Sequence, residues 1–310
     1  MGAVGNVTTV HYGTTWDDTT LLEEVKQTNL ELERKDGIRR HFRYDWQEVA
    51  KYNPAYLAYV EGERARLGDT HPLFLTQYCL VPVRGNSSFI SGQQRVQLQG
   101  EHKRQSQPSP GKIYIAGIDL AGETEEEEGA LLRTLKPRQD STVVTIGELD
   151  TAGSLLTAAP LVRVVEHYCW TGMKHTSLYA QLVDILKNVW HCKRILVDAT
   201  GIGQPVASFL KETLGGAVVP FHFSQPSKSQ LGFNLLAAID SGRLKTYAAD
   251  GSPEYLEFWQ EMEKAKSHYR ASQTMNFYVD PAQGHDDFLM SLALMMEATN
   301  QYSPRSAKGR

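Results

Sequence analysis

Four aspartates lie beside apolar runs, at three places far apart in the chain: Asp119, Asp198, Asp286 and Asp287. A carboxylate beside a buried strand or helix is costly unless it faces water, a partner or a ligand. Mg²⁺ prefers a few carboxylates together with water and phosphate oxygens. Two divalent ions, about 3.5–4 Å apart, can activate an attacking water and stabilise the leaving oxygen of a phosphodiester. If the fold brings these aspartates together, they predict a site for two Mg²⁺ or Mn²⁺ ions and a nuclease.

Asp119 lies in the apolar run 113–120, which we expect to be a strand. Gly117, Ala121 and Gly122 would leave room for a metal ion or a phosphate to approach the backbone. The alternative is that Asp119 belongs to an edge strand or a turn and binds nothing.

Asp198 ends the apolar run 194–198 and is followed by a glycine-rich turn, 199–203. Pro205 then fits the first turn of a helix. This order places Asp198 at the carboxyl end of a strand, where open α/β sheets bind ligands. The alternative is that Asp198 or Thr200 only caps the following helix.

Asp286 and Asp287 begin the helical segment 286–298. The helix dipole favours acids in a first turn, so a capping role is the alternative here. A cap needs only one aspartate, however, and two adjacent acids repel each other. The preceding residue, His285, is a candidate for proton transfer or phosphate contact, with an ordinary surface histidine as the alternative.

Composition and missing motifs exclude several other classes of protein. The sequence has no Gly-x-Ser-x-Gly, no His-Glu-x-x-His and no P-loop, so those hydrolase and nucleotide sites are not expected. The three cysteines are far apart, which argues against a disulfide framework or a cysteine zinc site: Cys79, Cys169 and Cys192. No apolar run is long enough to span a membrane. The net charge of −4 decides nothing about nucleic acid, because a bound metal reverses the local field.

The pattern of predicted helices and strands changes near residue 112. Residues 16–67 predict two or three helices, 71–83 predict a strand, and 84–111 are polar and predict an irregular linker. Further on, strands are expected at 112–120, 141–149, 161–169, 194–198 and 217–223. Helices are expected at 178–189, 205–214, 229–241, 253–267 and 286–298.

The first three of these strands have no helical pattern between them, so they predict an antiparallel meander. The later strands alternate with helices and predict parallel pairing. The fold class is therefore α/β, a mixed sheet flanked by helices and preceded by a small, mostly helical segment. Residues 123–140, which contain Glu123 and Glu125–Glu128, are expected to form a solvated polar loop, and 299–310 a flexible tail.

Several segments resemble the nuclease domain of the large terminase subunit, the DNA-packaging motor of tailed phages. They are GIDLA at 117–121, VDATGIG at 197–203, GHDD at 284–287, and the stretch from 227–231 to 241–244. The resemblance covers residues 112–298 and implies an RNase H-like fold that cleaves double-stranded DNA. It also implies that Asp119 bridges both metals, that Asp198 holds one and Asp287 the other, and that Asp286 ligates or tunes the site.

The first part of the chain is similar to the same family. YGTTW at 12–16 resembles the coupling motif near the end of the terminase ATPase domain, and 53–74 resembles the segment that leads to the nuclease. The resemblance implies an ATPase-domain remnant over 1–83, a linker over 84–111 and the nuclease over 112–298. Because the Walker motifs are missing, no ATPase activity is expected from this chain alone.

The resemblance also implies partners and a location. Candidates for contacts to DNA phosphates are Lys228, Arg243 and Lys245, since lysine and arginine supply sequence-independent affinity. The alternative is that they belong to an ordinary solvated helix face. Double-stranded DNA, the portal protein and the small terminase subunit are the expected partners, and the host cytoplasm the expected location.

Three other functions remain open on the sequence. A Holliday-junction resolvase or transposase would use the same chemistry on another DNA shape. A DNA-gripping or portal-docking module would keep its nuclease silent. An actin-like or sugar-kinase ATPase would use the loop after Asp198 for phosphate, but it needs a second repeat of the fold.

Overall fold

The computed structural model describes residues 8–18, 20–83, 86–121, 141–150, 159–173, 175–270 and 272–300. The expected acidic loop at 123–140 and the residues after 300 lie outside this part. The chain separates into two compact units, 1–87 with 268–274, and 88–267 with 275–310. None of the helices described is both long and apolar enough for a membrane span.

The first unit is helical, as the sequence predicts. Its helices are α1 (Leu21–Asp36), α2 (Trp46–Ala50), α3 (Pro54–Leu67) and α4 (Pro72–Gln77). Asp45 and Asn53 cap α2 and α3, each accepting the backbone N–H three residues further on. Gly37, in the left-handed region with φ 74°, ends α1.

The strand predicted over 71–83 is wrong, because residues 72–77 form helix α4. Pro72 is preorganised for a first helical turn, and the ring of His71 accepts the N–H of Leu73. Phe74 and Tyr78 are four residues apart, which is helical spacing, and their rings lie 5.3 Å apart.

The irregular linker predicted over 84–111 is wrong for residues 92–98, which form helix α5 (Gly92–Leu98) after the short strand β1 (Asn86–Ser88). Ser91 and Gln94 form a reciprocal capping box. Leu98 is fully buried, so this segment belongs to the core despite its polar composition.

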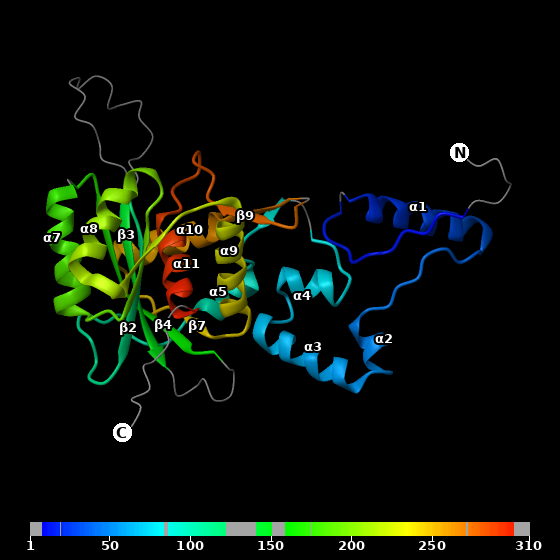
Figure 1. Cartoon of the computed structure of the whole chain (residues 1–310), viewed down its shortest axis with the longest axis horizontal. Helices are drawn as coiled ribbons and strands as arrows, with labels where there is room; N and C mark the ends of the chain where they lie inside the picture. The colour runs from blue at the N-terminus through cyan, green and yellow to red at the C-terminus, as the bar shows by residue number, and fades with distance from the viewer. Residues whose placement is uncertain are drawn as a thin grey trace, which may run out of the picture. The chain divides into compact units, whose positions relative to one another are not determined.

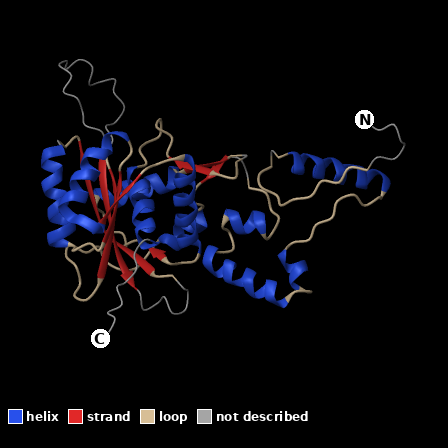
Figure 2. Cartoon of the chain, in the orientation of Figure 1, coloured by secondary structure: helices blue, strands red, loops and turns tan. Residues whose placement is uncertain are grey.

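A six-stranded sheet with the order β6-β5-β2-β3-β4-β7 forms the centre of the second unit (Figure 2). Its strands are β2 (Ile113–Asp119), β3 (Ser141–Asp150), β4 (Leu161–Thr171), β5 (Arg194–Asp198), β6 (Val218–Phe221) and β7 (Leu244–Lys245). β2, β3 and β4 pair antiparallel, whereas β5 pairs parallel with β2, and β6 parallel with β5. The predicted meander followed by parallel strands is confirmed. A smaller sheet has the order β1-β8-β9, with β8 (Lys266–Tyr269) and β9 (Met275–Tyr278).

Helices cover both faces of the large sheet (Figure 1). On one face lie α7 (His175–Val183), the π-helical segment Asp184–Val189 that continues it, and α8 (Gln204–Leu214). Every second residue of β2 faces this side and joins its core: Tyr114, Ala116 and Ile118. On the other side lie α9 (Gln225–Asp240), α10 (Pro253–Lys264) and α11 (Asp287–Asn300).

Helix α11 packs directly on the middle of the sheet, and glycine makes this possible. A Cβ on Gly117 of β2 would lie 2.1 Å from the carbonyl oxygen of Ser291 and 2.2 Å from the backbone nitrogen of Met295. Beside this contact the hydroxyls of Thr145 and Ser291 are 2.7 Å apart and buried. The alternation of β2 therefore turns Gly117, and two residues later Asp119, toward the α11 side.

A buried histidine should make the second unit sensitive to acid. Burial lowers the pKa of His167 to about 3, and the side chain is 1% exposed. Between about pH 6.5 and pH 3 the unfolded chain takes up a proton that the folded chain does not. As the pH is lowered through that window, the free energy of unfolding should therefore decrease by up to about 1.4 kcal/mol per pH unit.

The side chain of the variant His167→Gln cannot titrate in this range. Its free energy of unfolding, measured by urea titration at pH 6, 5 and 4, should therefore depend less steeply on pH. It should also be less stable at pH 7, because Nδ1 of His167 lies 3.0 Å from the Tyr247 hydroxyl. Exposed His191, in the left-handed region that asparagine tolerates, provides the control His191→Asn. An unchanged slope in His167→Gln would contradict the prediction.

Candidate metal centre

The four predicted aspartates lie at one end of the large sheet. β2 and β5 run parallel and end at Asp119 and Asp198, and β3 starts at the same end, with Asp119 opposite Val143. The backbone N–H of Ser141, the first residue of β3, donates to Oδ2 of Asp287 at 2.8 Å. Two strand ends and the start of α11 thus meet there.

Asp119 interacts electrostatically with all the other three aspartates. Burial, followed by the negative charges of Asp287, Asp198 and Asp286, raises the pKa of Asp119 well above its ordinary value, and Lys228 opposes the shift. A carboxylate in this setting is costly to ionise without a nearby cation.

A tight turn holds Asp198. Its Oδ1 accepts the backbone N–H of Thr200 at 2.8 Å, and a Cβ on Gly203 would come within 2.6 Å of its carbonyl oxygen. Burial raises the pKa of Asp198, while the bonds to Thr200 and the charges of His222 and Lys228 act against that rise. The residue before α8 is Gly203, which makes no side-chain cap, so the bond of Asp198 orders the turn and not the helix start.

Asp286 and Asp287 occupy the first turn of α11. The carbonyl of Asp286 accepts the N–H of Met290 at 2.8 Å, which makes Asp286 the N-cap position and Asp287 the first helical residue. Asp287 is 8% exposed, and Asp286 is half-buried.

A fifth carboxylate, Glu261 of α10, interacts with these aspartates but belongs to no motif in the sequence. It is 3% exposed, and its Oε2 accepts the backbone N–H of Leu289 in the first turn of α11 at 2.9 Å. Burial, with the charges of Asp287, Asp286 and Asp119, raises the pKa of Glu261 to about 10, against the effect of the Leu289 bond. Its position between the buried residues Phe258 and Met262 on one helix face is the sequence signal that could have revealed it.

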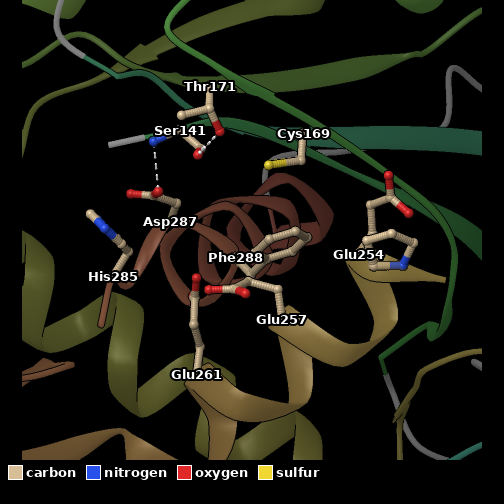
Figure 3. A pocket seen from close by; sticks show the side chains of 10 residues that line it. Ser141, Cys169, Thr171, Glu254, Glu257, Glu261, His285, Asp287 and Phe288 are labelled. Atoms are coloured by element: carbon tan, nitrogen blue, oxygen red, sulfur yellow. Dashed lines mark hydrogen bonds between the residues drawn. The ribbon is translucent and has the colours of Figure 1, made fainter. Parts of the chain in front are cut away.

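A cavity of about 310 Å³ opens beside Asp287 (Figure 3). Its wall combines acids with small polar and apolar groups: Ser141, Cys169, Thr171, Pro253, Glu254, Glu257, Glu261, His285, Asp287 and Phe288. His285 thus lines the same cavity as Asp287.

The three predicted basic residues do not lie together. Lys228, in the first turn of α9, interacts with Asp119 and Asp198, and its ammonium lies 5.4 Å from the centre of the Phe277 ring. Arg243 and Lys245 lie elsewhere, because β7 pairs with the first residues of β4, roughly 25 Å along the strand from its end near the aspartates. Lys245 donates to the carbonyl of Gln97 there.

The donor set fits a hard divalent cation. Within the described ranges, no three His, Cys, Asp or Glu side chains are arranged to hold a metal ion as they stand. The chemistry of the groups still favours one, since all four aspartates offer hard oxygen ligands. Burial and mutual repulsion raise the pKa of Asp119, and a cation among these acids would offset both.

Comparisons with known proteins relate the chain to one family. Residues 159–298 match the family model described as the terminase RNaseH-like domain. No curated protein matches the sequence.

Several solved structures are similar. The large terminase nuclease from thermophilic phage G20c is 22% identical over 70% of this chain and 99% of its own, with a TM-score of 0.50. The same nuclease with bound magnesium is 21% identical over 68% of this chain and 97% of its own, with a TM-score of 0.49. The HK97 bacteriophage large terminase is 14% identical over 91% of this chain and 61% of its own, with a TM-score of 0.47.

Over residues 159–298, the family match confirms the resemblance to the terminase nuclease domain that was inferred from the sequence. At 22% identity, the likeness to the G20c nuclease bears on the fold alone. Together with the family match, it confirms the predicted RNase H-like fold.

Proposed function

We propose, from the match of residues 159–298 to the terminase RNaseH-like domain, that the chain is a metal-dependent endonuclease that cleaves double-stranded DNA during phage genome packaging. One observation supports this most: Asp119, Asp198 and the Asp286–Asp287 pair, from β2, β5 and α11, converge at one end of the sheet.

Each aspartate has a proposed part in the site. Asp119 lies on the central strand and interacts with the other three, which supports a role as a ligand to both of two Mg²⁺ or Mn²⁺ ions. Asp198 and Asp287 would each hold one ion, and Asp286 would be a further ligand or a tuning charge. The bound ions would supply Lewis-acid activation of water and stabilisation of the leaving oxygen.

Other residues would orient the aspartates or contact the substrate. The Ser141 amide and the Thr200 amide hold the carboxylates of Asp287 and Asp198 in fixed directions. His285, beside Asp287, is positioned for a proton transfer or a phosphate contact. The DNA role of Arg243 and Lys245, at the other end of the sheet, would be contact with the duplex away from the cleavage point.

The biological setting follows from the same proposal. The protein would work in the host cytoplasm with the portal protein and the small terminase subunit. The proposed layout is an ATPase-domain remnant in the first unit and a nuclease in the second unit, which begins at residue 88 and includes helix α5. No ATP hydrolysis is expected from the chain by itself.

A plasmid assay tests the proposal directly. Supercoiled DNA should be converted to nicked and linear forms in Mg²⁺ or Mn²⁺ and remain intact in EDTA. DNA binding without cleavage in either metal would favour the DNA-gripping module instead. Cleavage of four-way junctions but not of plasmid would favour a resolvase.

Lys228 should contribute to DNA binding near the metal centre. Replacing it with alanine removes a cation close to Asp119 and Asp198, so the loss of affinity should be larger at low salt than at high salt. Loss of one phosphate contact should also lower the slope of log Kd against log salt by about 0.9.

Fluorescence anisotropy on a short duplex, from about 50 to 200 mM salt, measures both quantities. Binding is assayed in Ca²⁺ to prevent cleavage. Lys187→Ala, at an exposed position on the opposite face of the sheet, is the matched control. A salt-independent loss in Lys228→Ala would indicate misfolding and not a lost phosphate contact.

A further inference from the structure

Glu261 connects α10 to the start of α11 through a single hydrogen bond. Its Oε2 accepts the backbone N–H of Leu289, at 2.9 Å, and the whole contact is buried. Leu289 is the third residue of α11, and the first backbone N–H groups of a helix have no partner within it. A side chain at the N-cap usually satisfies the N–H at this third position. Here a residue from a different helix accepts it.

Helix α10 is well fixed, so this bond is a firm restraint. Ser252 caps its first turn by accepting the N–H of Tyr255 at 3.2 Å. One turn before Glu261, Phe258 is 1% exposed and packs against the ring of His167, 5.0 Å away. Phe288 of α11 packs on that same ring at 5.4 Å. Both helices thus contact the ring of His167, and the hydrogen bond from Leu289 to Glu261 joins them.

We propose that Glu261 is a positioning residue: by accepting the Leu289 amide it fixes the first turn of α11 and the two aspartates on it. The inference rests on the proposed function and adds a residue that acts through others. The acceptor oxygen is the essential part of Glu261. Because Glu261 of α10 accepts the N–H of Leu289, the carboxylate of Asp286 is not required as the acceptor of that N–H.

Two variants separate the acceptor from everything else. Glu261→Gln keeps an oxygen that can accept the Leu289 N–H and removes the acid. Glu261→Leu keeps the approximate size and removes the acceptor. Glu263→Leu, at an exposed position of the same helix, is the matched control.

Mn²⁺ affinity of the full chain, measured by calorimetry, is the first readout. Glu261→Leu should weaken it by about 10–100-fold, the usual effect of losing a residue that orients a metal ligand. Glu261→Gln should stay within about threefold of the wild type, and Glu263→Leu should match the wild type. Hydrogen exchange of the Leu289 amide is the second readout, and it should accelerate in Glu261→Leu only.

The outcomes distinguish the two proposals. If the wild type neither binds Mn²⁺ nor cleaves DNA, the proposed function fails. If the wild type binds Mn²⁺ and Glu261→Leu binds it equally well, only the positioning role fails. Equal losses in the leucine and glutamine variants would also overturn it, because they would show that the acid itself is required. Should Glu261→Leu not fold, weakened Mn²⁺ binding in folded Glu261→Gln overturns the proposal, and unchanged binding with a protected Leu289 amide supports it.

Discussion

The variant Asp119→Asn is expected to lose metal-dependent DNA cleavage by about a thousandfold or more, while its fold remains intact. Asparagine has nearly the same shape but carries no negative charge and is a poorer ligand for a hard divalent ion. Asp119 interacts with every other aspartate of the centre, so its loss should affect both ions. Removing one group that stabilises charge in the transition state typically lowers the reaction rate by about 10²–10³-fold, and losing a catalytic metal ion should lower it further.

The same variant should be more stable than the wild type when EDTA removes metal. Burial and three like charges raise the pKa of Asp119, so its ionised form destabilises the folded state. The neutral amide removes that repulsion and should raise the melting temperature. Adding Mn²⁺ should stabilise the wild type but not the variant.

Plasmid cleavage and thermal melting of Asp119→Asn, Asp198→Asn and Asp287→Asn measure these effects. Asp150→Asn is the control, because Asp150 ends β3 at the end of the sheet away from the metal centre. Full cleavage by any of the three variants would remove that aspartate from the site. A variant that loses activity and also melts far below the wild type would point to a structural role.

The sequence predicted the nuclease fold well because its elements carry strong local signals. Apolar runs set β2 and β5, and β5 was predicted at the observed residues, 194–198. The aspartates stand out for the same reason, since Asp119 lies within an apolar run, Asp198 ends one, and Asp286 and Asp287 precede one. Chain direction then places strand ends together, because β2 and β5 are parallel.

The errors have physical causes as well. The capping box at Ser91 lies in polar sequence, and helix α5 was missed because the burial of Leu98 depends on tertiary packing. The bulky side chains of residues 71–83 favour a strand, but the four-residue spacing of Phe74 and Tyr78 fits the helix that forms there.

Glu261 and the two distant basic residues show a different limit. Glu261 has no motif, and its importance arises only where α10 meets α11. Arg243 and Lys245 were grouped with Lys228 by charge, but the pairing of β7 with the start of β4 separates them from the aspartates. Local patterns therefore indicate candidate metal ligands on regular elements, while candidate supporting residues such as Glu261 require the tertiary structure.

The variant Gly117→Val is expected to have the largest effect on stability. Even a Cβ at this position would lie 2.1 Å from the oxygen of Ser291 and 2.2 Å from the nitrogen of Met295. Both atoms belong to the backbone of α11, so no side-chain rotation can relieve the clash. Overpacking of a core usually costs about 1–3 kcal/mol, and a clash with backbone on a central strand should exceed about 4 kcal/mol.

Urea unfolding followed by far-ultraviolet circular dichroism measures the loss, with Gly216→Ala as control. A Cβ on Gly216 meets nothing within 4 Å, so that change should stay within about 1 kcal/mol. Wild-type stability in Gly117→Val would show that α11 does not approach β2 this closely.

The same contact bears on the metal centre. Gly117 is two residues from Asp119 on the side of β2 that faces α11, the helix that starts with Asp287. The distance between strand and helix therefore sets the separation of two proposed metal ligands. In the milder variant Gly117→Ala, any molecules that still fold must move α11 outward. They should bind Mn²⁺ more weakly than the wild type even at temperatures where they are fully folded, because the two carboxylates can no longer face each other at the distance that shared ions require.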